Sequence, residues 1–217
     1  MYGTKEELKM NVMGIGAHFD DLELGCGGTL MKHVQKGDKV TMIIITDSSY
    51  KNAKGEQVRD AEIARQEGLK AASIIGADLI CLNYKTFMVP YDEVLSHEII
   101  RYIEDLRIDI VYSPWVHDLH RDHQYAGKTT LMAGRHVPRF LMYKSNYYDT
   151  EHTFRGNIYS DISGFMDKKI ETIEVHRSEM QRIRYAWPEF IKKQNANDGQ
   201  KIGVDYAECF EVVRYLI

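Results

Sequence analysis

The sequence predicts an α/β fold, namely a single Rossmann-like domain over residues 1–217 with a mostly parallel sheet flanked by helices and a smaller mixed C-terminal part. Short apolar runs alternate with amphipathic segments of helical length through about the first 115 residues, which is typical of a parallel sheet. Residues 40–46 form a nearly continuous β-branched run, as expected for a strand buried on both faces. A chain of 217 residues is long enough for one large core and short for two.

Each expected element follows from a local pattern. Short apolar runs that end in polar or glycine-containing turns predict strands at residues 12–17, 40–46, 79–82, 108–112, 140–148, 157–161 and 209–217. Apolar residues at helical spacing predict helices at residues 25–36, 60–75, 91–106, 124–135 and 166–184. Gly37 and Gly76 suit the left-handed C-caps of two of these helices. The polar stretch 47–56 is expected to be a loop, and residues 192–201 a mobile surface segment.

Composition excludes several classes of function. The net charge of −4 gives no electrostatic reason to bind nucleic acid, and no apolar run approaches the roughly 20 residues that cross a bilayer. Residues 1–9 carry charges of both signs and no apolar core, so they are not expected to form a signal peptide. The three cysteines lie far apart without a C-x-x-C pair, which favours reduced thiols in a cytoplasmic protein rather than a thiolate-rich zinc site: Cys26, Cys81 and Cys209.

Two clusters of acids and histidines each follow a predicted strand. The first is Ala-His-Phe-Asp-Asp-Leu-Glu at residues 17–23, and the second is His-Asp-Leu-His-Arg-Asp-His at residues 117–123. Ligands of open α/β sheets bind at the carboxyl ends of the strands, and such clusters are costly there without a cation or a proton-transfer role. The sequence therefore predicts a mononuclear metal site split over two loops, with His18, Asp21 and His123 as ligands and an open position for water.

The remaining polar residues of the clusters suit a hydrolytic reaction. Zinc lowers the pKa of bound water to about 7, and Asp20 could take the proton of that metal-bound water. His120 could stabilise an oxyanion or protonate a leaving amine, and Asp122 or Asp118 could orient a histidine. The alternative is that the adjacent aspartates only cap a helix and that the second cluster is a polar turn.

The glycines and the aromatic residues each allow another interpretation. Five glycines near the first cluster suggest a dinucleotide-binding loop, but Phe19 stands where G-x-G-x-x-G needs its last glycine. Gly27 and Gly28 are instead expected to let the first helix pack closely. Four aromatic residues are candidates for stacking on a sugar ring, although a core role is more common for such residues: Trp115, Tyr143, Tyr147 and Tyr148.

A family resemblance extends over most of the chain. Residues 17–30, AHFDDLELGCGGTL, resemble the A-H-P-D-D-x-E-x-G-x-G-G signature of the PIG-L (LmbE-like) zinc-dependent de-N-acetylases. Residues 118–123, DLHRDH, resemble the D-x-H-x-D-H motif of that family. Segments at 65–76, 169–178 and 203–210 resemble the Arg/Glu helix, the K-x-E…H-x-S-Q segment and the closing G-x-x-Y-A-E-x-F of the family.

The resemblance implies a zinc-dependent hydrolase that removes acetyl from an N-acetylated amino sugar or its conjugate. Zinc is then expected on His18, Asp21 and His123, with Asp20 as general base and His120, supported by Asp122, at the oxyanion or leaving group. The same ligands also suit Fe²⁺, Co²⁺ or Mn²⁺. Because relatives often assemble, the resemblance also makes a homo-oligomer a possible state of this chain. The alternatives are an amidase of the same fold acting on another acyl or thiol-sugar conjugate, and a non-catalytic metal- or sugar-binding module.

The chain departs from the family pattern near the expected substrate. Phe19 replaces the motif proline, which predicts either a less rigid loop or a substrate contact. Glu179 replaces the glutamine of H-x-S-Q, and Ala64 stands where relatives often have arginine. Arg65 or Arg59 is expected to replace that arginine. The expected substrate-binding residues are therefore Arg65, His176 and Phe19.

Overall fold

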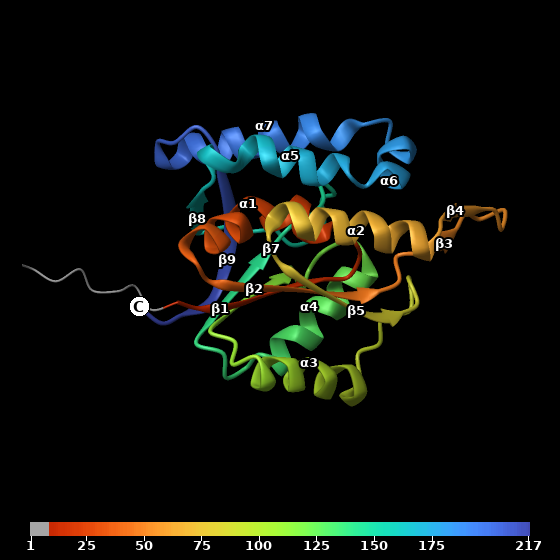
Figure 1. Cartoon of the computed structure of the whole chain (residues 1–217), viewed down its shortest axis with the longest axis horizontal. Coiled ribbons are helices and arrows are strands. Elements are labelled where there is room, and N and C mark those ends of the chain that lie inside the picture. Colours follow the sequence, from red (N-terminus) through yellow and green to blue (C-terminus); the bar gives the residue numbers. More distant parts are fainter. Residues whose placement is uncertain (1–8) are drawn as a thin grey trace, which may run out of the picture.

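The computed structural model describes residues 9–217 and has a central sheet between layers of helices (Figure 1). The N-terminal segment, where no signal peptide is expected, lies largely outside the described residues. Seven strands pair in the order β5-β2-β1-β6-β7-β9-β8. Their bounds are β1 Asn11–Gly16, β2 Lys39–Thr46, β5 Asp78–Tyr84, β6 Ile110–Pro114, β7 Arg139–Tyr143, β8 Ile158–Asp161 and β9 Ala207–Tyr215. The pairs from β5 to β7 are parallel, whereas β9 is antiparallel to β7 and β8, so the predicted fold class is confirmed.

Helices cover both faces of the sheet. On one face lie α1 (Asp21–Lys36) and α2 (Ala61–Ile75), and on the other lie α3 (Glu93–Asp105) and α4 (Arg121–Ala133) (Figure 1). The helices α5 (Met166–Glu174), α6 (Arg177–Arg182) and α7 (Ala186–Ile202) form a further layer, in which α5 packs on α1 and α2. The 3₁₀ turn Ser163–Phe165 leads into α5. No helix of the described part is long and apolar enough to cross a bilayer.

Three apolar clusters form the core. One lies between the sheet and α1 with α2, a second lies between the sheet and α3 with α4, and a third joins α1 to the outer helices. The strand β2 is buried from Val40 to Thr46, as expected for a central parallel strand. In α1, Gly25 lies directly against the Tyr143 ring, which leaves no room for a side chain there and lets the helix approach the sheet.

Some predicted elements are wrong in detail. Residues 192–201 are part of α7 rather than a mobile segment, because the buried Ile191, Asn195 and Gly199 pack this helix onto the body. The predicted strand 140–148 ends at Tyr143, and the helix predicted at 166–184 is divided into α5 and α6.

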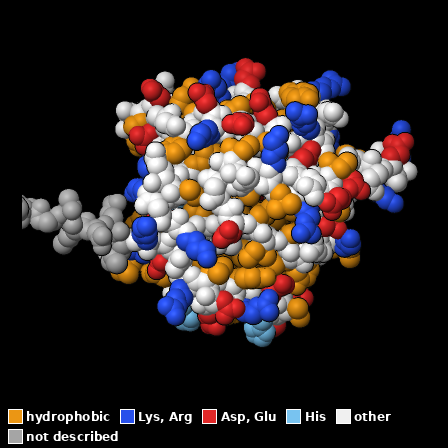
Figure 2. All heavy atoms as spheres, in the orientation of Figure 1, with side chains coloured by type: hydrophobic (Ala, Val, Ile, Leu, Met, Phe, Trp, Pro, Cys, Tyr) orange, Lys and Arg blue, Asp and Glu red, His pale blue; other side chains and the backbone are white. Residues whose placement is uncertain are grey.

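A short hairpin projects from the body between β2 and α2. Its strands are β3 (Tyr50–Lys51) and β4 (Gln57–Arg59), which pair antiparallel. Figures 1 and 2 show it extending well beyond the rest of the fold, with charged side chains at its tip. The side chains of Tyr50 and Arg59, at its base, line a cavity at the carboxyl ends of the strands.

Candidate metal centre and active site

The two acid-and-histidine clusters meet at the switch point of the sheet. The chain leaves β1 toward β2 on one side and returns through β6 on the other, so the loops after β1 and β6 diverge. Such a divergence opens a crevice at the carboxyl ends of the strands. His18 to Asp21 occupy the first loop and the start of α1, while His120 and His123 begin α4. A cavity of about 240 Å³ lies over them.

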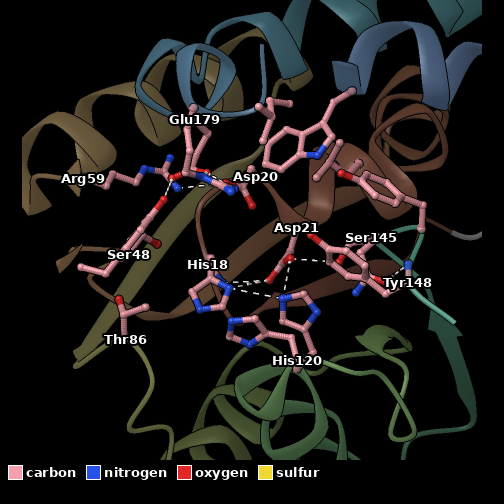
Figure 3. Close-up of a pocket in the computed structure, with 18 of the residues that line it drawn as sticks. His18, Asp20, Asp21, Ser48, Arg59, Thr86, His120, Ser145, Tyr148 and Glu179 are labelled. Carbon is pink, nitrogen blue, oxygen red and sulfur yellow. Dashed lines mark hydrogen bonds and ion pairs between the residues drawn. The ribbon is translucent and has the colours of Figure 1, made fainter. Parts of the chain in front are cut away.

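The three predicted metal ligands converge in this crevice, and Figure 3 shows two of them, His18 and Asp21, directed toward each other. His18 Nδ1 lies 3.3 Å from His123 Nε2, and the Asp21 carboxylate lies 3.1 Å from His123 Nε2 and 3.6 Å from His18 Nδ1. The Ser145 hydroxyl and the His18 backbone N–H each donate to one Asp21 oxygen, at 2.9 Å. These donors are the nitrogen and oxygen types that zinc accepts, and their mutual spacing places them around a single point.

A second carboxylate stands behind each of the two histidines. Asp122 Oδ2 lies 3.0 Å from His18 Nε2, and Asp118 Oδ2 lies 3.4 Å from His123 Nδ1. Carboxylates in this position fix the orientation of metal-ligating imidazoles. The expectation that Asp122 supports His120 is wrong at the level of side chains, because the Asp122 carboxylate contacts His18 and only its backbone N–H reaches His120.

The charged groups of this cluster shift one another's pKa values. Burial raises the pKa of Asp21, but the neighbouring His123 and His18 outweigh burial and lower that pKa below its ordinary value. Burial lowers the pKa of His123, but Asp21 and Asp118 raise it well above its ordinary value. The buried carboxylates thus favour positive charge at the point where the donor atoms meet, and a divalent cation satisfies this preference.

His120 has a different environment from the other two histidines. It is the N-cap of α4, where its Nδ1 accepts from the backbone N–H of Asp122 at 3.2 Å, so the neutral ring carries its proton on Nε2. The ring stacks on Phe87. Burial, followed by the charges of His18 and His123, lowers the pKa of His120 to about 4. His120 is therefore a neutral hydrogen-bond donor near the cavity.

The three histidines also form an alternative ligand set. Donor atoms of His18, His120 and His123 all lie within 4.8 Å of one another, close enough to hold a divalent cation. The fit of the cluster to a metal therefore does not depend on Asp21 alone.

Asp20 occupies the strained turn between β1 and α1. Its backbone has a φ of 130°, a conformation that non-glycine residues rarely adopt and that is often associated with functional sites. Its Oδ2 accepts from Arg59 at 2.9 Å. Burial raises the pKa of Asp20 to about 6, although Arg59 opposes that shift. A carboxylate with a pKa in this range can exchange a proton near neutral pH.

Arg59 is a site residue whose contact with Asp20 cannot be inferred from its position in the sequence. It comes from β4, its side chain is 2% exposed, and it contacts Asp20, Glu67 at 3.4 Å and His176 at 3.3 Å. Arg59 thus supplies a guanidinium beside the acidic cluster in a chain where Ala64 replaces the family arginine. Because β4 lies on a projecting hairpin, only the three-dimensional fold shows that Arg59 reaches Asp20.

The three residues expected to bind substrate do not line the cavity. Arg65 is exposed on α2, which carries it away from the site. The Phe19 ring is buried against Gly68, while its backbone N–H donates to Ser48 Oγ at 2.8 Å. His176 is fully buried behind Arg59. Phe19 is therefore a packing residue, and His176 contacts Arg59 rather than the cavity.

The wall of the cavity combines polar and aromatic side chains. Tyr50 and Arg182 both bond to the buried Glu179, at 2.8 Å from the tyrosine hydroxyl and 2.7 Å from the arginine Nε. Of the four aromatic candidates, Tyr147 and Tyr148 line the cavity, whereas Trp115 and Tyr143 are buried in the core. The lining residues not predicted from the sequence include Leu24, Ser48, Tyr50, Thr86, Phe87, Ser145, Asn146, Arg182, Ile183 and Trp187.

Comparison with known proteins identifies the family. Residues 13–133, more than half of the chain, match the family model described as PIG-L, GlcNAc-PI de-N-acetylase. The chain belongs to the PIG-L family. A diacetylchitobiose deacetylase of Thermococcus kodakarensis is 28% identical to this PIG-L member over 226 residues, which cover 93% of the chain and 82% of the relative.

Solved structures confirm the fold of this PIG-L protein. The N,N'-diacetylchitobiose deacetylase of Pyrococcus horikoshii superposes with a TM-score of 0.80 at 24% identity, covering 94% of this chain and 84% of that one. GalB, the 4-carboxy-2-hydroxymuconate hydratase of Pseudomonas putida, superposes with a TM-score of 0.77 at 17% identity, covering 96% and 98%. A hydratase therefore shares this fold, so the reaction has to be argued from the site.

Proposed function

We propose that this PIG-L protein is a zinc-dependent N-deacetylase that hydrolyses the acetamide of an N-acetylated amino sugar or amino-sugar conjugate. The observation that carries the proposal is the convergence of His18, Asp21 and His123 beside a separate carboxylate, Asp20. Two imidazoles and one carboxylate are the ligand class of catalytic zinc sites, in which a coordination position stays open. The deacetylase relatives support the same class of reaction.

The proposed zinc ligands are His18, Asp21 and His123, and His120 stays outside the ligand set. Asp21 is within 3.6 Å of both other ligands, and each of the two histidines has a carboxylate on its far nitrogen. His120 has no such carboxylate, since its second nitrogen caps α4. Bound zinc would supply Lewis acidity that polarises the amide carbonyl and acidifies water.

Asp20 is proposed to act as the general base. Its Oδ2 is held by Arg59, which leaves Oδ1 to take a proton from the attacking water. The same carboxyl group then holds the proton that the departing amine requires. One water is consumed, the C–N bond breaks, and acetate and a free amine are formed.

His120 is proposed to stabilise the oxygen of the acetyl group as negative charge develops there. Its Nε2–H makes no hydrogen bond to another described residue, so it is free to donate. The pKa of about 4 keeps this ring neutral at physiological pH, which makes it a donor rather than a cation.

The cavity walls are consistent with a sugar. Tyr147 and Tyr148 offer aromatic faces, and Tyr50, Glu179 and Arg182 offer polar groups in the same cavity. Sugars combine apolar faces with hydroxyl edges, and mixed walls of this kind recognise both.

The test is acetate release from a panel of N-acetylhexosamine conjugates by the purified protein. Acetate should form, vanish on chelation and return when zinc is added. Release that persists at full rate after verified metal removal would contradict the proposal. A metal-loaded protein that hydrolyses only other acyl amides would support the alternative amidase, and one that binds sugars without turnover would support the binding module.

A further inference from the structure

We propose that His117 and His152 form a second transition-metal site, separate from the active site, that ties the loop 144–157 to the loop after β6. The two imidazole rings come from different loops, and their centroids lie 4.1 Å apart with an interplanar angle of 42°. Imidazole suits Zn²⁺, Ni²⁺ and Cu²⁺. The cavity beside this pair shares no lining residue with the active-site cavity.

Neighbouring contacts hold the two histidines in place. The His117 ring packs edge-on against the Trp115 ring at 5.5 Å, and Phe154 packs edge-on against the same indole at 5.5 Å. Trp115 is 1% exposed. The buried indole thus contacts residues of both loops and holds the loops next to each other. The two histidines therefore already lie close together before an ion binds, which reduces the entropic cost of chelation.

The polar surroundings allow a cation with an open coordination sphere. Glu151 Oε1 lies 3.5 Å from His152 Nε2, and both side chains are more than half exposed. Gln124 and Thr150 line the same cavity, and Lys128 is the positive group that faces it. The proposed ligands from the protein are the two imidazoles, and water fills the remaining coordination positions of the ion.

The loop 144–157 connects the His117–His152 pair to the active site, because other residues of this loop contact the proposed zinc ligands or their partners. Asn146, on the loop that carries His152, donates at 2.7 Å to both oxygens of Asp118, which stands behind His123. Ser145 on the same loop donates to Asp21. An ion on the histidine pair would therefore restrain a loop that also supports two of the proposed zinc ligands.

Stoichiometry tests the proposal directly. The protein is first loaded with one equivalent of Zn²⁺ and then titrated calorimetrically with Ni²⁺ at a pH above the ordinary imidazole pKa of about 6.5. Wild type should bind an additional equivalent of Ni²⁺, and His117→Ala and His152→Ala should each lose that equivalent. The matched control is His97→Ala, because His97 is an exposed histidine near a carboxylate, 3.7 Å from Glu93, without a second imidazole, and it should behave as wild type.

A spectroscopic readout separates this site from the active site. Cu²⁺ on His117 would lie beside Trp115, so it should quench the indole fluorescence in wild type and much less in His152→Ala. Equal Ni²⁺ uptake and equal quenching in wild type and His152→Ala would overturn the proposal. Failure of the proposed deacetylase activity leaves this result unaffected, because the comparison measures metal binding at exposed residues.

Discussion

Two largely buried histidine–aspartate pairs lie on helices that cover opposite faces of the sheet, His33 on α1 and His123 on α4. His123 contacts Asp118 where the strands end, and His33 contacts Asp38 near the start of β2, with His33 Nδ1 2.6 Å from Asp38 Oδ2. The second nitrogen of His33 bonds to the Tyr112 hydroxyl at 2.9 Å. The second nitrogen of His123 instead meets two other candidate ligands at the floor of a cavity.

The difference lies in the second ring nitrogen. Both nitrogens of His33 are occupied by protein groups, so this pair can only stabilise the fold. In His123, one nitrogen is oriented by a carboxylate and the other converges with further donors, which is the arrangement of a metal ligand. A buried histidine–aspartate pair therefore indicates a metal or catalytic site only when the second ring nitrogen faces a cavity and lies close to other metal-binding atoms.

The largest expected loss of turnover that leaves zinc in place is at the carboxylate beside the cluster, Asp20. Asp20→Ala should lower kcat by about 10²- to 10⁴-fold, since general-base catalysis typically contributes that much. Zinc content, measured by atomic spectroscopy, should remain at one equivalent. Loss of zinc together with activity would make Asp20 a ligand and contradict its assignment.

The next prediction distinguishes the proposed zinc ligand His123 from the proposed oxyanion donor His120. His123→Ala should abolish both zinc binding and acetate release, because it removes a central donor. His120→Ala should retain zinc and lose turnover by about 10²- to 10³-fold, as expected for loss of one oxyanion donor. Equal loss of zinc in the two variants, measured after dialysis against the same buffer, would favour the three-histidine ligand set.

At the structural pair, a change should alter stability and leave chemistry intact. Burial lowers the pKa of His33 below its ordinary 6.5. The unfolded chain therefore takes up this proton at a higher pH than the folded protein, so the contribution to stability is complete above about pH 6.5 and declines as the pH falls below it. His33→Gln should reduce this acid sensitivity.

The measurement is urea unfolding of His33→Gln and wild type across that pH range, with His97→Ala as the control. Loss of the two hydrogen bonds should cost about 1–3 kcal/mol at neutral pH, while kcat/KM should stay at the wild-type value. A large loss of activity in folded His33→Gln would show that the comparison of the two pairs is wrong.

The smallest expected effect is at the wall of the cavity. Glu179→Gln restores the family residue and keeps an acceptor for Tyr50, but it removes the charge that faces the half-exposed Arg182. Such partly exposed pairs contribute roughly 0–1 kcal/mol, so the melting temperature should change little. KM should change more than kcat, and an unchanged specificity across the conjugate panel would exclude a role for this charge in recognition.

The sequence predicts those features that depend on residues close to one another along the chain. His18 and His120 each lie in a short segment in which a strand is followed by a turn and a helix. Because the site residues of each segment are only a few positions apart, the motif alone places them at the end of the strand. The alternation of strands and helices likewise fixes the parallel sheet, because parallel strands need such crossovers.

The remaining features depend on contacts distant in sequence. Nothing local indicates that Arg59 reaches Asp20 from a hairpin, or that Asp122 turns toward His18 rather than His120. Local composition does not indicate helix α7, because its buried side includes the polar Asn195 and Asp198 and therefore resembles a loop. Which nitrogen or carboxylate faces which partner is decided by the packing of separate elements.

The Phe19 ring seated on Gly68 has a consequence for the history of this family. A side chain at position 68 would collide with that ring, so the aromatic residue and the glycine are sterically matched. A relative with the motif proline at position 19 has no ring there and has space for a larger residue on α2. The two positions should therefore covary among homologues, and the change from proline at the active-site loop should have occurred only in lineages where the facing helix already carried glycine.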